Sequence, residues 1–118
     1  MMISYSRNRE DVILARVFDA QADGFYIDVG ARHPEHGSLT KHAYDRGWSG
    51  INIEPLPSLH SALTTARPRD LCLQCGLGKT EAKRTLYAAI APEQQGLSTF
   101  DREQAEHDCK ELRVAFEE

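Results

Sequence analysis

The stretch GFYIDVGA at residues 24–31 decides the fold. In an extended chain Phe25 and Ile27 point to one side and Tyr26 to the other, so both faces are apolar. A strand that is apolar on both faces is typical of the middle of a parallel sheet, and here it predicts burial on both faces. A glycine turn at Gly30 follows and leads towards a helix. Strand, glycine turn and helix in this order form the nucleotide pocket of open α/β sheets, beyond the carboxyl end of a central strand.

Hydrophobic periodicity and turn residues extend this pattern in both directions. They predict helices over about residues 8–20, 39–46, 56–66 and 101–116, and strands over residues 48–54, 71–75 and 84–90. Up to residue 76 the order is that of parallel βαβ units. The expected helix caps are Asn8, Ser38, Ser58 and either Thr99 or Asp101, with Gly47 as a helix stop. Trp48, at the entry to the second strand, is expected in the core.

The bulk composition excludes several classes of protein. The 118 residues predict one domain at most, and the net charge of −4 with mixed signs is not a nucleic-acid footprint. No apolar run approaches the ~20 residues of a membrane helix, and the N-terminus lacks the apolar core of a signal peptide. Three cysteines fit reduced thiols better than a disulfide framework. We therefore expect a soluble cytoplasmic protein that binds neither nucleic acid nor membrane.

Residues at the ends of the first two strands suggest a cofactor site. Glycine at position 30 permits close approach to the backbone, and Glu54 lies at the distance along the chain where a ribose-binding carboxylate is expected. The alternative is that Gly30 is only a turn glycine and Glu54 a solvated strand end. The dinucleotide fingerprint G-x-G-x-x-G is absent, because Arg32 and Glu35 stand at its later glycine positions. A cofactor without phosphates is favoured, such as S-adenosylmethionine, with Asp28 facing its charged methionine end.

Several blocks together give a resemblance to a known family. They are Ser4-Tyr5-Ser6 with Glu10-Asp11, residues 24–31, the run GWSGINIEP at residues 47–55, Leu77-Gly78, and the run GLST at residues 96–99. Jointly they resemble the FkbM family of S-adenosylmethionine-dependent methyltransferases, up to about Asp101. The chain departs from the family's pattern at residues 7–9, which are Arg-Asn-Arg, and at Gly76-Leu77.

The resemblance implies a fold, a site and an activity. The fold is α/β, a Rossmann-like class I methyltransferase fold with a mostly parallel sheet and flanking helices. The cofactor-binding residues are Asp28, Gly30 and Ala31 in the first loop and Glu54 on the ribose hydroxyls. The activity is methyl transfer, often to a hydroxyl oxygen of a small molecule or carbohydrate. The family's domain continues further, so we expect residues 1–118 to be a single FkbM-like domain that is truncated at its C-terminus, the cofactor-binding half.

Histidines and cysteines offer two weaker hypotheses. His33 and His36 together with Cys72 and Cys75 could hold zinc, but residues three apart on a strand point to opposite faces, so the two thiols would not converge. His33 and His36 could also act as general bases. The alternative, which we favour, is that they are loop histidines that shape the mouth of the pocket.

The first strand is expected to lack one neighbour. In a class I sheet it is central, yet the sequence supplies a clear partner on one side only. Its other edge would be covered by residues 84–90, by the C-terminal segment or by another chain, with self-association as one outcome. Two rival functions follow: a non-catalytic fragment that serves as an interaction module, and, more weakly, a nucleotide-dependent enzyme.

Overall fold

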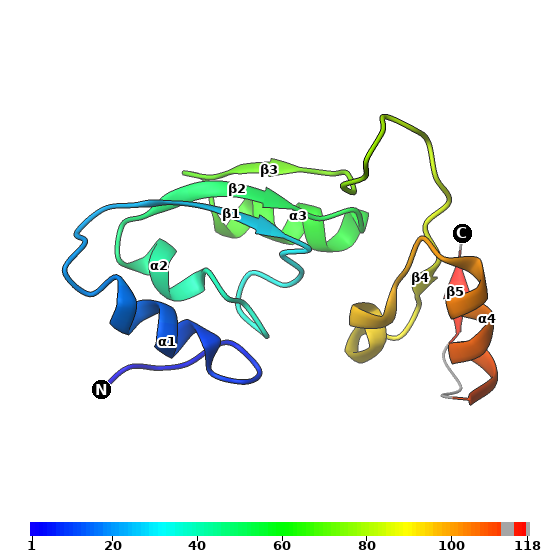
Figure 1. The fold of residues 1–118 in the computed structure, drawn as a ribbon, viewed down its shortest axis with the longest axis horizontal. Coiled ribbons are helices and arrows are strands. Elements are labelled where there is room, and N and C mark those ends of the chain that lie inside the picture. The colour runs from blue at the N-terminus through cyan, green and yellow to red at the C-terminus, as the bar shows by residue number, and fades with distance from the viewer. Residues whose placement is uncertain (112–114, 118) are drawn as a thin grey trace. The chain divides into compact units, whose positions relative to one another are not determined.

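The computed structural model describes residues 1–111 and 115–117, which form two compact units (Figure 1). The first unit spans Met1–Leu77 and the second Gly78–Glu118. The first contains α1 (Glu10–Val17), β1 (Phe25–Val29), α2 (Lys41–Asp45), β2 (Ser49–Ile53), α3 (Pro57–Ala66) and β3 (Leu71–Leu73). The second contains β4 (Ala88–Ala89), a 3₁₀ helix η1 (Pro92–Leu97), α4 (Arg102–Glu111) and β5 (Phe116–Glu117).

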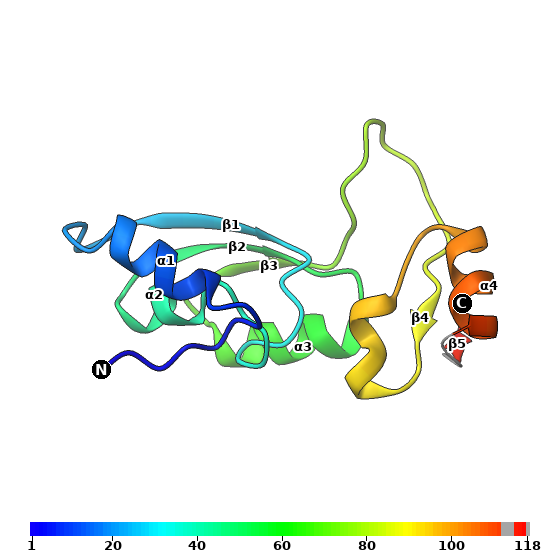
Figure 2. The ribbon, with the colours of Figure 1, turned by 60° about the horizontal axis from the view of Figure 1, so that its bottom comes forward.

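The first unit is built on a three-stranded parallel sheet in the order β1-β2-β3. The register sets Val29 beside Ile53 and Ile53 beside Leu73, so the three strands end at the same edge. Helices α1, α2 and α3 all lie on one side of this sheet (Figures 1 and 2). The predicted alternation of helices and parallel strands is therefore confirmed for this unit, as an α/β arrangement with a small flanked sheet.

The prediction that β1 is buried on both faces is wrong, because only one of its faces is covered. Phe25, Ile27 and Val29 point away from the helices and are 63%, 60% and 58% exposed, respectively. Asp28, on the opposite face, is buried. The physical reason is that the helices of this unit cover only one face, so the outward apolar residues of β1 have no layer above them.

Close contacts explain the glycine before β1 and the glycine within β2. A side-chain carbon at Gly50 would lie 2.1 Å from the Tyr26 carbonyl oxygen, and one at Gly24 would lie 2.6 Å from the Trp48 ring. Trp48 is 8% exposed, so its predicted place in the core is confirmed. Gly47, with φ +102°, ends α2 as predicted.

The three helix N-caps predicted in this unit are wrong. Helix α1 begins after Arg9, which has φ 61° and no capping side-chain bond, while Asn8 donates to Glu10 instead. In α3 the first position is taken by Pro57, whose fixed φ suits it, so Ser58 has no capping role. Helix α2 is shorter than predicted and its N-cap is Thr40, so Ser38 lies two residues before the cap, where it accepts the N–H of Lys41 at 3.0 Å.

Asp11 fixes the chain before α1. It is 2% exposed, and its carboxylate accepts the Ser4 hydroxyl and the Tyr5 N–H, each at 2.7 Å. Burial alone would raise the pKa of Asp11, but the hydrogen bonds from Ser4, Tyr5 and Ser6 outweigh it and leave that pKa below its ordinary value. The N-terminal residues are thereby tied to the first turn of the helix.

The second unit differs more from the predictions. The predicted strand at residues 84–90 is reduced to β4, which pairs antiparallel with β5 and not with β1. Helix α4 ends at Glu111, because Phe116 belongs to β5, and residues 112–114 of the predicted helix lie outside the described residues. Asp101 caps α4 as predicted, by accepting the N–H of Glu103 at 2.9 Å.

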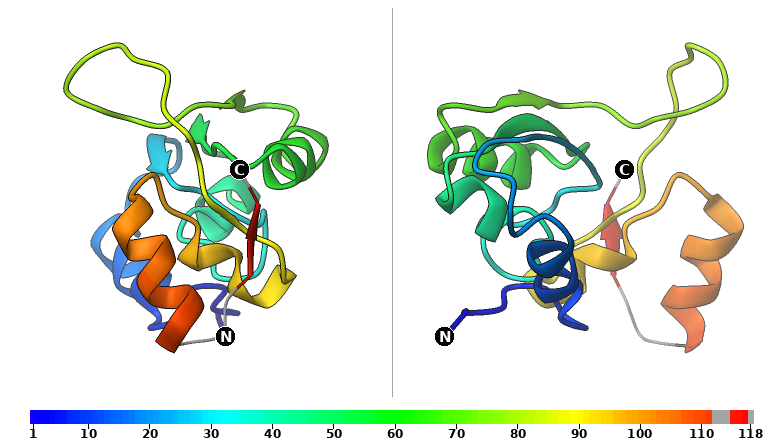
Figure 3. Two further views of the ribbon diagram at one scale, coloured as in Figure 1. Left: turned by 90° about the vertical axis from the view of Figure 1, so that its right-hand side faces the viewer. Right: turned by 60° about the vertical axis from the view of Figure 1, so that its left-hand side comes forward.

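Between the units, residues 74–86 form an extended connection without helix or strand (Figure 3).

Within the described ranges, 1–111 and 115–117, no helix has the length and apolar character needed to cross a membrane.

Candidate functional site

The turn after β1 lies where the sequence places it, at the carboxyl end of the strand. The N–H groups of Gly30 and Ala31 both donate to the Ile53 carbonyl oxygen, at 2.8 and 3.1 Å. Gly30 has φ +69°, and a side-chain carbon there would meet nothing within 4 Å. This backbone conformation favours glycine, and the space beside it is open to a bound molecule.

Glu54 lies beside this turn. Its Oε2 accepts the backbone N–H of Arg32 at 2.8 Å, and its Oε1 accepts the N–H of Leu56 at 2.9 Å. The residue is 3% exposed. Each carboxylate oxygen has two acceptor positions, so each oxygen keeps one after these bonds. The structure thus brings Gly30, Ala31 and Glu54 together, as their spacing predicts.

Asp28 lies on the other side of the backbone, under the sheet. It is 8% exposed, and its Oδ2 accepts the hydroxyl of Thr40 at 2.7 Å. Cofactor binding by Asp28 stays a prediction. The contact that the structure shows for it is internal and joins the end of β1 to the segment before α2.

Arg67 is the residue that the sequence reasoning missed. It is 1% exposed, and one guanidinium nitrogen donates to Thr40 Oγ1 at 2.6 Å. The other donates to the Pro34 carbonyl oxygen and to Ser38 Oγ, each at 2.8 Å. A chain of hydrogen bonds therefore runs from Arg67 through Thr40 to Asp28. An arginine at the end of a helix carries no sequence signal for such a role, because this residue type is usually exposed.

A second polar group continues this network beneath β2. Asp70 accepts the N–H of Gly50 at 2.9 Å, the side-chain amide of Asn52 at 2.8 Å and the hydroxyl of Tyr26. Burial raises the pKa of Tyr26, and the hydrogen bond to Asp70 raises it further. The hydroxyl of Tyr26 is therefore a donor at all ordinary pH values.

His33 and His36 lie in the loop after Gly30, with their rings stacked at 4.5 Å. His33 Nδ1 accepts the N–H groups of Glu35 and His36, both at 3.1 Å. Burial lowers the pKa of His33, and His36 lowers it further. In a neutral imidazole whose Nδ1 accepts, the proton is on Nε2, so the basic nitrogen of His33 is already used to shape the loop.

Arg32 lies at the mouth of the same loop with a left-handed φ of 59°. Burial lowers the pKa of its guanidinium, and the nearby Arg7 lowers it further, whereas Glu54 acts in the opposite sense. Its Nε is buried and has no hydrogen-bond partner among the residues described. The site therefore combines one buried carboxylate with a partly buried positive charge.

Cysteines and histidines do not converge in the part of the chain that is described. No three His, Cys, Asp or Glu side chains come together there as a metal site requires. Cys72 Sγ accepts instead from the Asn52 side chain, at 3.7 Å.

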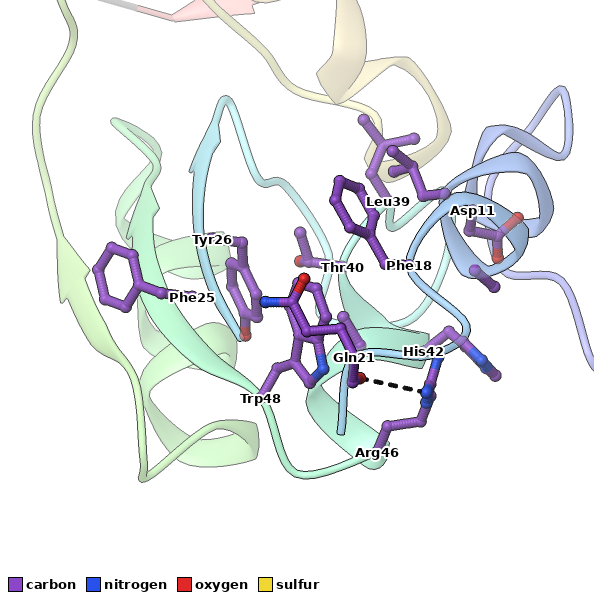
Figure 4. A pocket seen from close by; sticks show the side chains of 13 residues that line it. Asp11, Phe18, Gln21, Phe25, Tyr26, Leu39, Thr40, His42, Arg46 and Trp48 are labelled. Carbon is purple, nitrogen blue, oxygen red and sulfur yellow. Dashed lines mark hydrogen bonds between the residues drawn. The ribbon is translucent and has the colours of Figure 1, made fainter. Parts of the chain in front are cut away.

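A cavity of about 230 Å³ lies elsewhere in the first unit, between α1, β1 and α2 (Figure 4). It lies towards the amino ends of the strands, since Phe25 and Tyr26 open β1 and Trp48 precedes β2. It is therefore distinct from the Gly30 turn at the carboxyl ends.

Comparison with known protein families, with curated proteins and with solved structures finds no match for this chain.

Proposed function

We propose that this chain is the cofactor-binding half of an S-adenosylmethionine-dependent methyltransferase of the FkbM type, with a Rossmann-like class I fold. The observation that carries the proposal is the hydrogen bond from the Arg32 N–H to Glu54 Oε2, at 2.8 Å. It joins the glycine turn of β1 to the carboxylate that follows β2, 22 residues later. A site for an adenosine-containing cofactor needs these two groups at one edge of a parallel sheet.

The residues present fit such a cofactor. Gly30 leaves open space beside the backbone, and each oxygen of Glu54 has one acceptor position left for a ribose hydroxyl. When bound, S-adenosylmethionine supplies an activated methyl group. The chain's own residues bind and orient it, and Asp28 acts through Thr40 by holding the loop.

Catalysis in this family type depends mainly on alignment of donor and acceptor. We propose a hydroxyl of a small molecule or carbohydrate as the acceptor, from the resemblance alone. His36 remains a weak candidate for a base, whereas His33 Nδ1 already accepts two backbone N–H groups.

Calorimetry with S-adenosylhomocysteine, the demethylated product, tests this proposal. Glu54→Gln keeps the size of the side chain and removes its charge, and we expect at least tenfold weaker binding, the size of effect typical of a lost charged hydrogen bond. Glu35→Gln is the matched control, because Glu35 is an exposed carboxyl in the same loop, and it should bind as the wild type does. Unchanged affinity in a folded Glu54→Gln protein would remove Glu54 from the site.

A second candidate is an interaction module without catalysis. It is favoured by the exposed apolar residues of β1, namely Phe25, Ile27 and Val29. A thermal-shift comparison of S-adenosylmethionine, S-adenosylhomocysteine and NAD separates the candidates. Stabilisation by the first two supports the methyltransferase, stabilisation by NAD alone supports a nucleotide-dependent enzyme, and no stabilisation by any of them supports the interaction module.

A further inference from the structure

Two arginines from distant parts of the sequence lie at the loop that follows β1. Arg32 belongs to this loop, and Arg7 comes from the segment before α1, which runs beside the loop (Figures 1 and 2). The N–H of Gly37 donates to the Tyr5 carbonyl oxygen at 2.9 Å and holds the two segments together. A side-chain carbon at Gly37 would lie 3.9 Å from both Cγ and Nε of Arg7. The Arg7 side chain therefore lies against the loop that carries Arg32.

Neither guanidinium group has an anionic partner among the described residues. The ion pairs of lysine and arginine in that part of the chain are formed by Lys41, Arg67 and Arg102. The Glu54 carboxylate is engaged by the backbone N–H groups of Arg32 and Leu56 instead of by a guanidinium group. The side-chain Nε of Arg32 is buried and lacks a hydrogen-bond partner there as well. Two positive charges at this loop are thus left without a matching anion.

The charge of Arg32 is held in an unfavourable place. Burial lowers the pKa of Arg32, the positive charge of Arg7 lowers it further, and Glu54 raises it by less than Arg7 lowers it. Arg32 also has a left-handed φ of 59°, which long side chains rarely adopt. Backbone conformations of this kind are concentrated at ligand sites. An anion near both guanidinium groups would relieve the repulsion between them.

The charge and the oxygen atoms of the anion indicate which kind fits. A guanidinium group binds the oxygens of carboxylates and phosphates in pairs. A carboxylate has two oxygens and one negative charge, so it satisfies one such group. A phosphate monoester has three terminal oxygens and a charge of about −1.5 to −2 at pH 7, which suits two guanidinium groups. S-adenosylmethionine contains no phosphate, so a phosphate at this loop would belong to the second substrate.

We infer that Arg7 and Arg32 bind a phosphate group of the methyl acceptor, which is therefore a phosphorylated small molecule such as a sugar phosphate. The assignment to a methyl acceptor rests on the proposed function. The cofactor occupies the open space beside Gly30, and the phosphate lies further along the same loop, towards Gly37. Arg7 is exposed, so the acceptor reaches the site from solvent.

Titration of the full chain, followed in a ¹H–¹⁵N correlation spectrum at constant ionic strength, tests the site. Inorganic phosphate and glucose 6-phosphate are the probes, and acetate and glucose are their matched controls. Both phosphates should shift the backbone amide signals of Arg32 and Gly37 in a saturable way. Acetate should bind about tenfold more weakly, the factor expected from one charged hydrogen bond fewer, and glucose should leave the signals unchanged.

Three variants make the test specific, with the Gly37 signal as the common readout. Arg32→Asn removes one guanidinium group, and asparagine tolerates a left-handed backbone. Arg7→Gln removes the other from an exposed position, where the fold does not depend on it. Each should weaken phosphate binding about tenfold and abolish the preference over acetate. Arg16→Gln makes the same change of charge at an exposed position of α1 and should bind phosphate as the wild type does.

Two results would overturn the phosphate site. One is acetate that binds as tightly as phosphate to the wild type, and the other is equal phosphate binding by Arg7→Gln and Arg16→Gln.

Calorimetry with S-adenosylhomocysteine, with and without saturating phosphate, shows which substrate carries the anion. Its affinity should be the same in both cases, because cofactor and acceptor bind side by side. Weaker binding in phosphate would assign the two arginines to the carboxylate of the cofactor and overturn the acceptor assignment. Failure of the proposed function gives a different result: S-adenosylhomocysteine does not bind at all, which overturns the methyl acceptor, whereas phosphate binding that depends on Arg7 and Arg32 still supports the phosphate site.

Discussion

A guanidinium group offers five donors in a fixed plane, which suits a place where several acceptors have to be held at once. Arg67 occupies such a place beneath the loop that follows β1. It donates hydrogen bonds to the Pro34 carbonyl oxygen, the Ser38 hydroxyl and the Thr40 hydroxyl. Its Nη1 also lies 4.0 Å from Oδ2 of Asp70. The conformation of the Gly30 loop thus depends on a residue from the far end of α3.

Replacing Arg67 tests this dependence. Arg67→Met leaves the buried acceptors of Pro34, Ser38 and Thr40 without their donor and removes the positive charge beside Asp70, so we expect a loss of about 3–5 kcal/mol in the free energy of unfolding. Arg67→Lys keeps the charge but not the planar fork, and its loss should be intermediate. Urea unfolding followed by circular dichroism measures both.

The matched control for this experiment is Arg16→Met. Arg16 is an exposed arginine on α1, and surface substitutions of this kind usually change stability by less than about 0.5 kcal/mol. Equal stability of Arg67→Met and Arg16→Met would show that the loop does not need the Arg67 bonds.

At the scale of elements, β1 is a strand with one paired edge. Gly30 donates to Ile53 and Gly24 accepts from Ser49, so the backbone groups of even-numbered residues face β2. Because these directions alternate along a strand, the N–H and C=O groups of Phe25, Ile27 and Val29 face the other edge. No strand of the described residues pairs there.

We expect this edge to promote self-association, which proline can block selectively. Ile27→Pro removes an N–H that does not point to β2, and edge positions of this kind tolerate proline. Ile27→Thr reduces the apolar surface at least as much as Ile27→Pro does but keeps the N–H. Sedimentation velocity over a range of concentrations should show association for the wild type and Ile27→Thr and a monomer for Ile27→Pro.

If Ile27→Thr is monomeric as well, the association proceeds through the apolar face of the sheet rather than through its edge. A monomeric wild type at all concentrations would contradict self-association altogether.

The sequence predicts those elements best whose signals are local. Strand β2 and helix α3 begin and end within two residues of their predicted limits, because glycine and proline mark their boundaries. The proximity of Gly30 and Glu54 also follows from strand order alone. Burial of the outer face of β1 depends on whether a layer of helices covers that side of the sheet. The role of Arg67 depends on hydrogen-bond acceptors in Pro34, Ser38 and Thr40, about 30 residues away in the sequence. Neither can be inferred from a local pattern.

At the scale of the whole molecule, the chain consists of two compact units joined by a segment without helix or strand, residues 74–86. Lys79, Lys83 and Arg84 lie in this segment and are exposed. Exposed segments that lack regular structure are preferred sites of proteolysis.

Limited digestion with trypsin should therefore cut first after Lys79, Lys83 or Arg84. Mass spectrometry should detect a lasting fragment that starts at Met1 and contains β1, β2 and β3. Early cleavage after Arg46 or Arg67, within the first unit, would contradict the division of the chain into these units.

The bonds of Arg67 also have a consequence for the order in which the chain folds during synthesis. The segment from Gly30 to Thr40 contains polar groups that find their partner only when α3 is complete. On the ribosome, this loop cannot reach its final conformation until residue 67 has emerged, however early β1 is made. The glycine turn and β3 should thus become protected from hydrogen exchange in the same step, as parts of one cooperative unit.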